Sequence, residues 1–186
     1  MVLASQVLGS QQGFAHLAPR DLDALSRCFR AREHRRGDLV LRQGDPGDSL
    51  LIVARGRLSV MVRAPDGAQR LIAEAGDGAV LGEMACVDPA PRCATVIART
   101  DSSAFVLSRD ALHALRAHAP GLANAVYDVI HRASIARLRT AHEQLVARVG
   151  PAPRPVSGIV PRAAPATIAE GSLARQLRDL LRRSAS

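Results

Sequence analysis

A glutamate and an arginine with complementary binding chemistry stand nine positions apart in residues 82–96, which read GEMACVDPAPRCATV. Arg92 carries a planar guanidinium that can donate two parallel hydrogen bonds to a phosphate. Glu83 carries a carboxylate that can accept hydrogen bonds from hydroxyl groups. Gly82, which has no Cβ, lets the backbone come close to a ligand. The stretch therefore combines an anion-binding group with a hydroxyl-binding group.

Small residues follow both the glycine and the arginine. Such residues leave backbone N–H groups uncovered, and clustered N–H groups bind anions. With the acid and the guanidinium, they predict a pocket for a sugar phosphate that takes an anion at one end and a diol at the other. The small residues are Ala85, Cys93 and Ala94.

The elements that must position this pocket read as short strands. Apolar and polar residues alternate over short runs, which glycine, proline and aspartate residues separate. Pro65-Asp66-Gly67 is typical of a hairpin turn. Such spacing predicts an antiparallel sandwich or barrel. The runs lie at residues 39–41, 50–53, 58–62, 71–73, 96–98 and 104–107.

Helical spacing flanks the predicted strands on both sides. Residues 14–32 form one such segment, in which Pro19 marks the helix start. A second helix begins after Ser108 and ends at Pro120, and a longer one covers residues 122–149. An apolar stripe on the long helix predicts packing against its own domain, with a helix pair or a dimer seam as the alternative. The stripe consists of Ile135, Leu138, Leu145 and Val149.

The cassette at residues 82–95 resembles that of the cyclic nucleotide-binding domain family, which includes catabolite-activator and protein kinase A regulatory proteins. The family's phosphate-binding cassette reads Gly-Glu-hydrophobic-Ala, a short helix, then Arg-small-Ala-Ser/Thr; here Gly82-Glu83-Met84-Ala85 and Arg92-Cys93-Ala94-Thr95 match it. The resemblance implies a fold that is mainly β with flanking α: an antiparallel, jelly-roll-like β-roll with N-terminal helices and C-terminal lid helices. It also implies that Arg92 holds the cyclic phosphate and Glu83 the ribose 2′-hydroxyl.

The resemblance implies an aliphatic base pocket lined by Val60, Ile72, Ala73 and Ala75. Cys93 follows the arginine at a position where a threonine suits guanine, and its thiol is only a weak hydrogen-bond donor. We therefore expect cAMP as the ligand, with cGMP as the alternative. C-terminal helices of relatives close over the base, which makes Arg132, Ser134 and Arg137 the lid candidates.

Composition sets further limits. The net charge of +8 comes from arginine alone, because the chain has no lysine; we favour a coding bias over selection for nucleic-acid binding. Cys28, Cys86 and Cys93 have no metal-binding spacing and suit a reduced compartment. We find neither a secretory signal nor an apolar run of the ~18 residues that would span a bilayer. We expect a soluble, cytoplasmic protein without a metal.

Three parts are predicted along the chain. Residues 1–13 form a flexible N-terminus, residues 14–149 form the cyclic nucleotide-binding domain with its C-terminal helices, and residues 150–186 form a proline-rich linker and a basic amphipathic tail helix. The tail can dock on its own domain, on an acidic protein or on anionic lipid.

The sequence thus predicts a sensor that passes cAMP occupancy through its C-terminal helices to a partner protein, with a homodimer left open. A transcription regulator of the catabolite-activator type is the alternative, although DNA binding is not expected from the residues after 150. An interaction module without a ligand is another alternative. We do not expect an enzyme, because no His-Glu-x-x-His pair, Gly-x-Ser-x-Gly elbow or Walker loop occurs.

Overall fold

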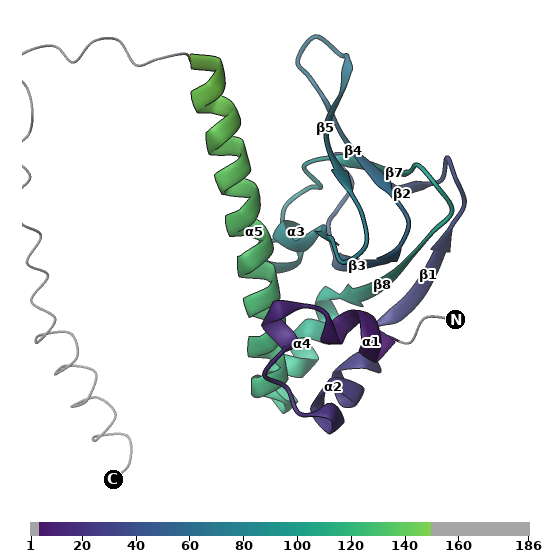
Figure 1. Ribbon diagram of the computed structural model, residues 1–186, viewed down its shortest axis with the longest axis vertical. Helices are drawn as coiled ribbons and strands as arrows, with labels where there is room; N and C mark the ends of the chain where they lie inside the picture. Colours follow the sequence, from purple (N-terminus) through teal and green to yellow (C-terminus); the bar gives the residue numbers. More distant parts are fainter. Residues whose placement is uncertain (1–3, 150–186) are drawn as a thin grey trace, which may run out of the picture. The chain divides into compact units, whose positions relative to one another are not determined.

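The computed structural model describes residues 4–149, and the predicted linker and tail helix lie outside the described residues (Figure 1). Two four-stranded antiparallel sheets form the β-roll. One has the order β1-β8-β3-β6 and the other β2-β7-β4-β5. The strands are β1 (Arg30–His34), β2 (Leu39–Leu41), β3 (Ser49–Arg55), β4 (Leu58–Arg63), β5 (Gln69–Ala75), β6 (Val80–Leu81), β7 (Thr95–Ala98) and β8 (Ser102–Ser108).

Strand β3 explains how the two layers of the core form. Successive side chains of a strand point to opposite faces, and both faces of β3 are covered, so its apolar run is continuous. Leu51 and Val53 pack between the two sheets with residues such as Leu58. Leu50 and Ile52 pack on the other face, against the helices. The first sheet is therefore the middle layer of the domain.

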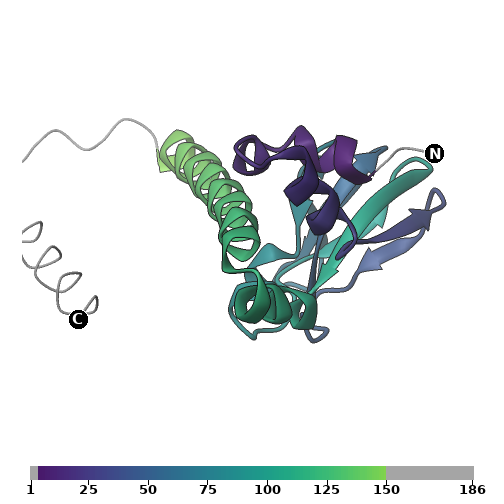
Figure 2. The ribbon, with the colours of Figure 1, turned by 90° about the horizontal axis from the view of Figure 1, so that it is seen from below.

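The N-terminal helices, the helix after β8 and the first turns of the last helix pack on that outer face of the first sheet (Figures 1 and 2). Ser108 begins α4 as predicted, because its hydroxyl accepts a hydrogen bond from the N–H of Ala111 at 3.1 Å. None of the helices in residues 4–149 is long and apolar enough to cross a membrane. The helices are α1 (Ala4–Gly9), a 3₁₀ turn η1 (Gln12–Phe14), α2 (Pro19–Ser26), α3 (Glu83–Val87), α4 (Arg109–His118) and α5 (Pro120–Val149).

The predicted fold, mainly β with flanking α in an antiparallel β-roll, is confirmed. The N-terminal segment differs from the prediction of a flexible stretch over residues 1–13, since it holds α1 and η1. Leu8 and Phe14 are fully buried in the core cluster under the helices. A six-residue helix is marginal by itself, so this packing explains why α1 forms.

The predicted helix over residues 14–32 is also shorter than expected. Helix α2 ends at Ser26, and β1 begins at Arg30 and pairs with β8 over five residues. Four residues of β1 are exposed, so the strand lacks the apolar alternation that marks strands in a sequence. Strand β1 lies at the edge of the sheet and pairs with β8 alone, so most of its side chains face water and no apolar alternation is needed.

Candidate functional site

A hollow of about 1300 Å³ lies among the cassette, the β4–β5 hairpin and α5. We call it the large hollow. The residues that the sequence predicted to bind the ligand or to form the lid all line it, although they come from four separate segments of the chain. They are Val60, Ile72, Ala73, Ala75, Gly82, Glu83, Met84, Ala85, Arg92, Cys93, Ala94, Arg132, Ser134 and Arg137.

Arg92 lies buried at one wall of the large hollow, with 6% of its surface exposed. Its Nη1 donates to the carbonyl oxygen of Ser49 at 2.6 Å and to that of Gly82 at 3.1 Å. Its Nη2 donates to Ser49 Oγ at 2.9 Å and reaches Asp48 Oδ1 at 3.4 Å. Burial lowers the pKa of Arg92 from its usual value, and the Asp48 carboxylate opposes that shift. The guanidinium therefore joins the start of β3 to the cassette.

Gly82 makes this geometry possible. Its φ of +73° lies in the left-handed region that favours glycine. A Cβ at this position would stand 2.5 Å from Arg92 Nη1 and 2.9 Å from the Ser49 carbonyl oxygen. The glycine thus lets the guanidinium sit against the cassette backbone.

Glu83 begins α3 and is 1% exposed. Arg137, from the middle of α5, donates to the Glu83 carboxylate and to the carbonyl oxygen of Val80. The Arg137 side chain is 44% exposed, so the ion pair has one buried and one half-exposed partner. A long-range contact of this kind joins the cassette to the C-terminal helix.

The other two lid candidates make no hydrogen bond to the cassette within residues 4–149. Arg132 pairs with Asp128 of its own helix at 2.8 Å, and its Nη1 is 3.5 Å from Gln12 Oε1. Ser134 lines the large hollow and makes no side-chain hydrogen bond within residues 4–149. Among the three, Arg137 alone makes a hydrogen bond to the cassette in the described part of the chain.

Sequence reasoning missed several residues of the site. The turn η1 lies so close to α5 that a Cβ on Gly13 would stand 2.6 Å from Val129 Cγ2. Gln11 Nε2 donates to the carbonyl oxygen of Gly78 at 3.0 Å. Helix α5 adds polar side chains one and two turns beyond Arg137. The missed lining residues include Gln11, Gly13, Gly78, Thr140 and Gln144.

Arg109 was also missed, although it holds the cassette from outside the hollow. The guanidinium of this half-buried first residue of α4 donates to the carbonyl oxygens of Gly47 and Ala85. Its backbone N–H donates to the carbonyl oxygen of Asp48 at 2.6 Å. Only the spatial meeting of α4 with α3 reveals this role, because nothing in the local sequence marks it.

The apolar stripe of α5 does not pack on its own domain as the sequence favoured. Ile135 is 50% exposed, Leu138 71% and Leu145 61%. The side chain of Val149 lies outside the described residues. The first turns of α5 are different, because Ala123, Val126 and Ile130 are buried in the core.

Comparisons with known proteins show which family the domain belongs to. The family described as "Cyclic nucleotide-binding domain" matches residues 31–119. A CRP-like cAMP-activated global transcriptional regulator of Mycobacterium tuberculosis is 30% identical over 140 residues, which are 75% of this chain and 61% of the regulator. The chain thus spans less than two thirds of that relative.

Two solved structures resemble the domain over more of their own length. The first is a cyclic nucleotide-binding domain from Methylobacillus flagellatus, with a TM-score of 0.72 and 30% identity over 78% of this chain and 82% of that one. The second is the N-terminal domain of a transcriptional regulator from Streptomyces coelicolor, with a TM-score of 0.60 and 31% identity over 74% of this chain and 95% of that one. The chain belongs to the cyclic nucleotide-binding domain family.

Proposed function

We propose that the chain is a sensor for cAMP. The observation that carries the proposal is the burial of Glu83 and Arg92 in the wall of one hollow, at 1% and 6% exposure. Removing two charges from water is costly even where each has a partner in the protein, so their retention beside a cavity suits a function. The arginine would bind the cyclic phosphate, and the glutamate would accept a hydrogen bond from the ribose 2′-hydroxyl.

Backbone donors support the same phosphate position. Within residues 4–149, the N–H groups of Cys93 and Ala94 donate no hydrogen bond to the protein. These groups directly follow Arg92, and adjacent N–H groups favour an anion. The phosphate would therefore receive hydrogen bonds from both side chain and backbone.

The base would lie against aliphatic side chains of the β4–β5 hairpin. Ile72 is 53% exposed although it lines the large hollow, so a flat base would cover apolar surface that is now open. Cys93 lines the hollow in place of a stronger hydroxyl donor. For this reason we rank cAMP above cGMP.

The proposed mechanism is a population shift that involves α5. Arg137 and the ribose hydroxyl would both approach the Glu83 carboxylate; Arg137 donates to Oε1, and a carboxylate has a second oxygen that can accept a hydrogen bond. A ligand shifts an equilibrium only through its difference in affinity between two arrangements. The position of α5 on the cassette would supply that difference.

A calorimetric titration of the full chain with cAMP, cGMP and 2′-deoxy-cAMP tests the proposal. We expect cAMP to bind more tightly than cGMP. Loss of a hydrogen bond to a charged group corresponds to about tenfold to a few hundredfold, so 2′-deoxy-cAMP should bind more weakly by this factor. Glu83→Gln should reduce that discrimination. Absence of binding by both cyclic nucleotides would exclude the sensor.

We further propose that the exposed stripe of α5 pairs with a second copy of the chain. Ile135, Leu138 and Leu145 follow three- and seven-residue intervals, which place them along one seam. Leu138→Glu should convert a dimer into a monomer in analytical ultracentrifugation, whereas Glu143→Arg, at an exposed position of the same helix that points away from the seam, should not. A wild-type chain that sediments as a monomer would contradict this part alone.

A further inference from the structure

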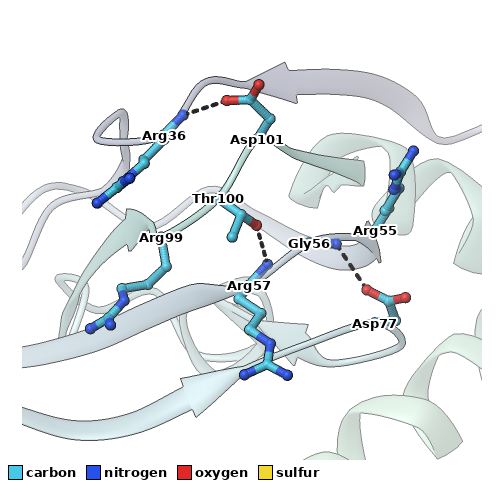
Figure 3. A pocket seen from close by; sticks show the side chains of 8 residues that line it. All are labelled: Arg36, Arg55, Gly56, Arg57, Asp77, Arg99, Thr100 and Asp101. Carbon is cyan, nitrogen blue, oxygen red and sulfur yellow. Dashed lines mark hydrogen bonds between the residues drawn. The ribbon is translucent and has the colours of Figure 1, made fainter.

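A second concave surface lies at one end of the roll, where several turns meet (Figure 3). It is lined by four arginines, which we call the arginine surface: Arg36, Arg55, Arg57 and Arg99. Arg55 is the last residue of β3, and the other three come from the β1–β2, β3–β4 and β7–β8 connections. None of the four lines the large hollow. Asp77 lines both concave surfaces, so the arginine surface adjoins the large hollow but has its own guanidinium groups.

The backbone under the arginine surface is fixed by side-chain acceptors. Asp77 Oδ1 accepts a hydrogen bond from the N–H of Gly56 at 2.9 Å, and Asp101 Oδ1 accepts one from the N–H of Arg36 at 2.9 Å (Figure 3). Thr100 Oγ1 accepts one from the N–H of Arg57 at 3.0 Å. The two aspartates thus hold turns in place through main-chain groups.

Three of the four guanidinium groups, in contrast, have no carboxylate partner within residues 4–149. Arg99 alone has one, Glu74 at 3.7 Å, and both side chains of this pair are about half exposed. In residues 4–149, no carboxylate lies within 4.0 Å of the guanidinium of Arg36, Arg55 or Arg57. An excess of like charge on a small surface repels itself and attracts anions. The arginine surface is therefore suited to a negatively charged partner.

The arrangement indicates which kind of anion fits. The guanidinium groups stand apart and do not converge on one point (Figure 3), so they match charges spread along a segment better than one small ion. Among residues 4–149, no aromatic side chain lines the surface, so this part of the chain offers no platform for stacking nucleic-acid bases. The interspersed Asp77 and Asp101 would repel a continuous phosphate backbone, whereas a protein segment can space its acids to match.

We infer that the arginine surface docks an acidic segment of a partner protein. Arginine suits this role because its planar fork pairs with carboxylates through two hydrogen bonds. The inference does not depend on the identity of the nucleotide.

The test uses the full chain, with a fluorescently labelled peptide of alternating glutamate and glycine as the probe. Fluorescence anisotropy at low salt measures its affinity for the wild type and for the Arg36→Gln/Arg55→Gln/Arg57→Gln variant. The matched control is Arg20→Gln/Arg63→Gln/Arg116→Gln, which removes the same charge from exposed positions elsewhere. The basic residues after 150 are common to all three chains. We expect the surface variant to bind the peptide about tenfold more weakly than the control.

The outcomes distinguish a local site from overall charge and from other anionic partners. Equal losses in the surface variant and in the control would overturn the inference, because overall charge would then explain binding. Displacement of the peptide by oligothymidylate or by anionic vesicles more readily than by unlabelled peptide would overturn it in favour of nucleic acid or membrane. Unchanged thermal unfolding and unchanged cAMP titration of the variant would show that its loss is local. A failure of cAMP binding in the wild type would leave the peptide result intact.

Discussion

Replacing Arg137 by glutamine should destabilise the domain even when no nucleotide is added. The structure shows that the Glu83 carboxylate is 1% exposed and that Arg137 donates to it from α5. No other group in residues 4–149 donates a hydrogen bond to this carboxylate. The substitution would leave a buried charge without its counter-charge, which is more costly than losing a surface pair.

The magnitude follows from the exposure of the two partners. Removing one member of a fully buried pair costs about 3–5 kcal/mol. Because the Arg137 side chain is 44% exposed, we expect a smaller loss, about 2–3 kcal/mol in the free energy of unfolding. At roughly 2–4 °C per kcal/mol for a chain of this size, Tm should fall by about 5–10 °C.

A double-mutant cycle measured by urea unfolding isolates this ion pair. Glu83→Gln removes the buried charge and leaves an arginine that can still reach water. The double variant Glu83→Gln/Arg137→Gln should therefore be less destabilised than the sum of the single variants, with a coupling of about 1–2 kcal/mol. The same helix offers the matched control, since Arg132 pairs with Asp128 at 2.8 Å on the surface. Arg132→Gln should cost about 0.3–0.5 kcal/mol.

Two outcomes would refute the reasoning. One is an Arg137→Gln variant that is no less stable than the Arg132→Gln control. The other is a cycle without coupling, which would mean that the carboxylate and the guanidinium do not interact in solution.

The remaining predictions concern the cassette. Arg92→Ala should lower the Tm of the nucleotide-free chain, because the guanidinium donates to two carbonyl oxygens, and circular dichroism should detect this. It should also weaken cAMP binding by about tenfold to a few hundredfold in calorimetry, because the same group would bind the phosphate. An unchanged Tm would contradict the first effect. Gly82→Ala should lower Tm in a thermal scan, since its Cβ would meet Arg92 at 2.5 Å in a left-handed conformation; equal stability would contradict the packing. Ellman's reagent at neutral pH should react readily with the exposed Cys93 and slowly with Cys86, because burial raises the pKa of the Cys86 thiol. Bound cAMP should protect Cys93. Faster reaction at Cys86 than at Cys93 would contradict the exposed position of Cys93.

The cassette could be predicted from the sequence because its parts are close together in the chain. Gly82, Glu83 and Arg92 fall within eleven consecutive residues, so the resemblance to the family's cassette could be recognised from one short stretch, and it implied the helix between the glutamate and the arginine. The strand pattern was equally local, since alternating residues mark a half-buried strand such as β4. Local patterns therefore sufficed for the roll and for the core of the site.

Contacts between distant segments had no such signal. Arg137 and Glu83 are 54 positions apart, and their meeting depends on where α5 crosses the cassette. The structural role of Arg92 had no signal either, because its guanidinium donates to the carbonyl oxygens of Ser49 and Gly82. These bonds could not be foreseen because main-chain acceptors leave no trace in the residue types.

Helix α5 combines three properties in one rigid element. Its first turns, with Val126 and Ile130, are anchored in the core, Arg137 touches the cassette in its middle, and Leu138 and Leu145 are exposed beyond it. At 1.5 Å per residue, Leu145 lies roughly 12 Å along the helix from Arg137. A nucleotide that changed the hold of Arg137 on Glu83 would therefore displace or release the apolar side chains further along the helix. In the proposed sensor, a second chain bound to this stripe would bind differently in the two states, and by reciprocity it would change the affinity for cAMP by the same factor.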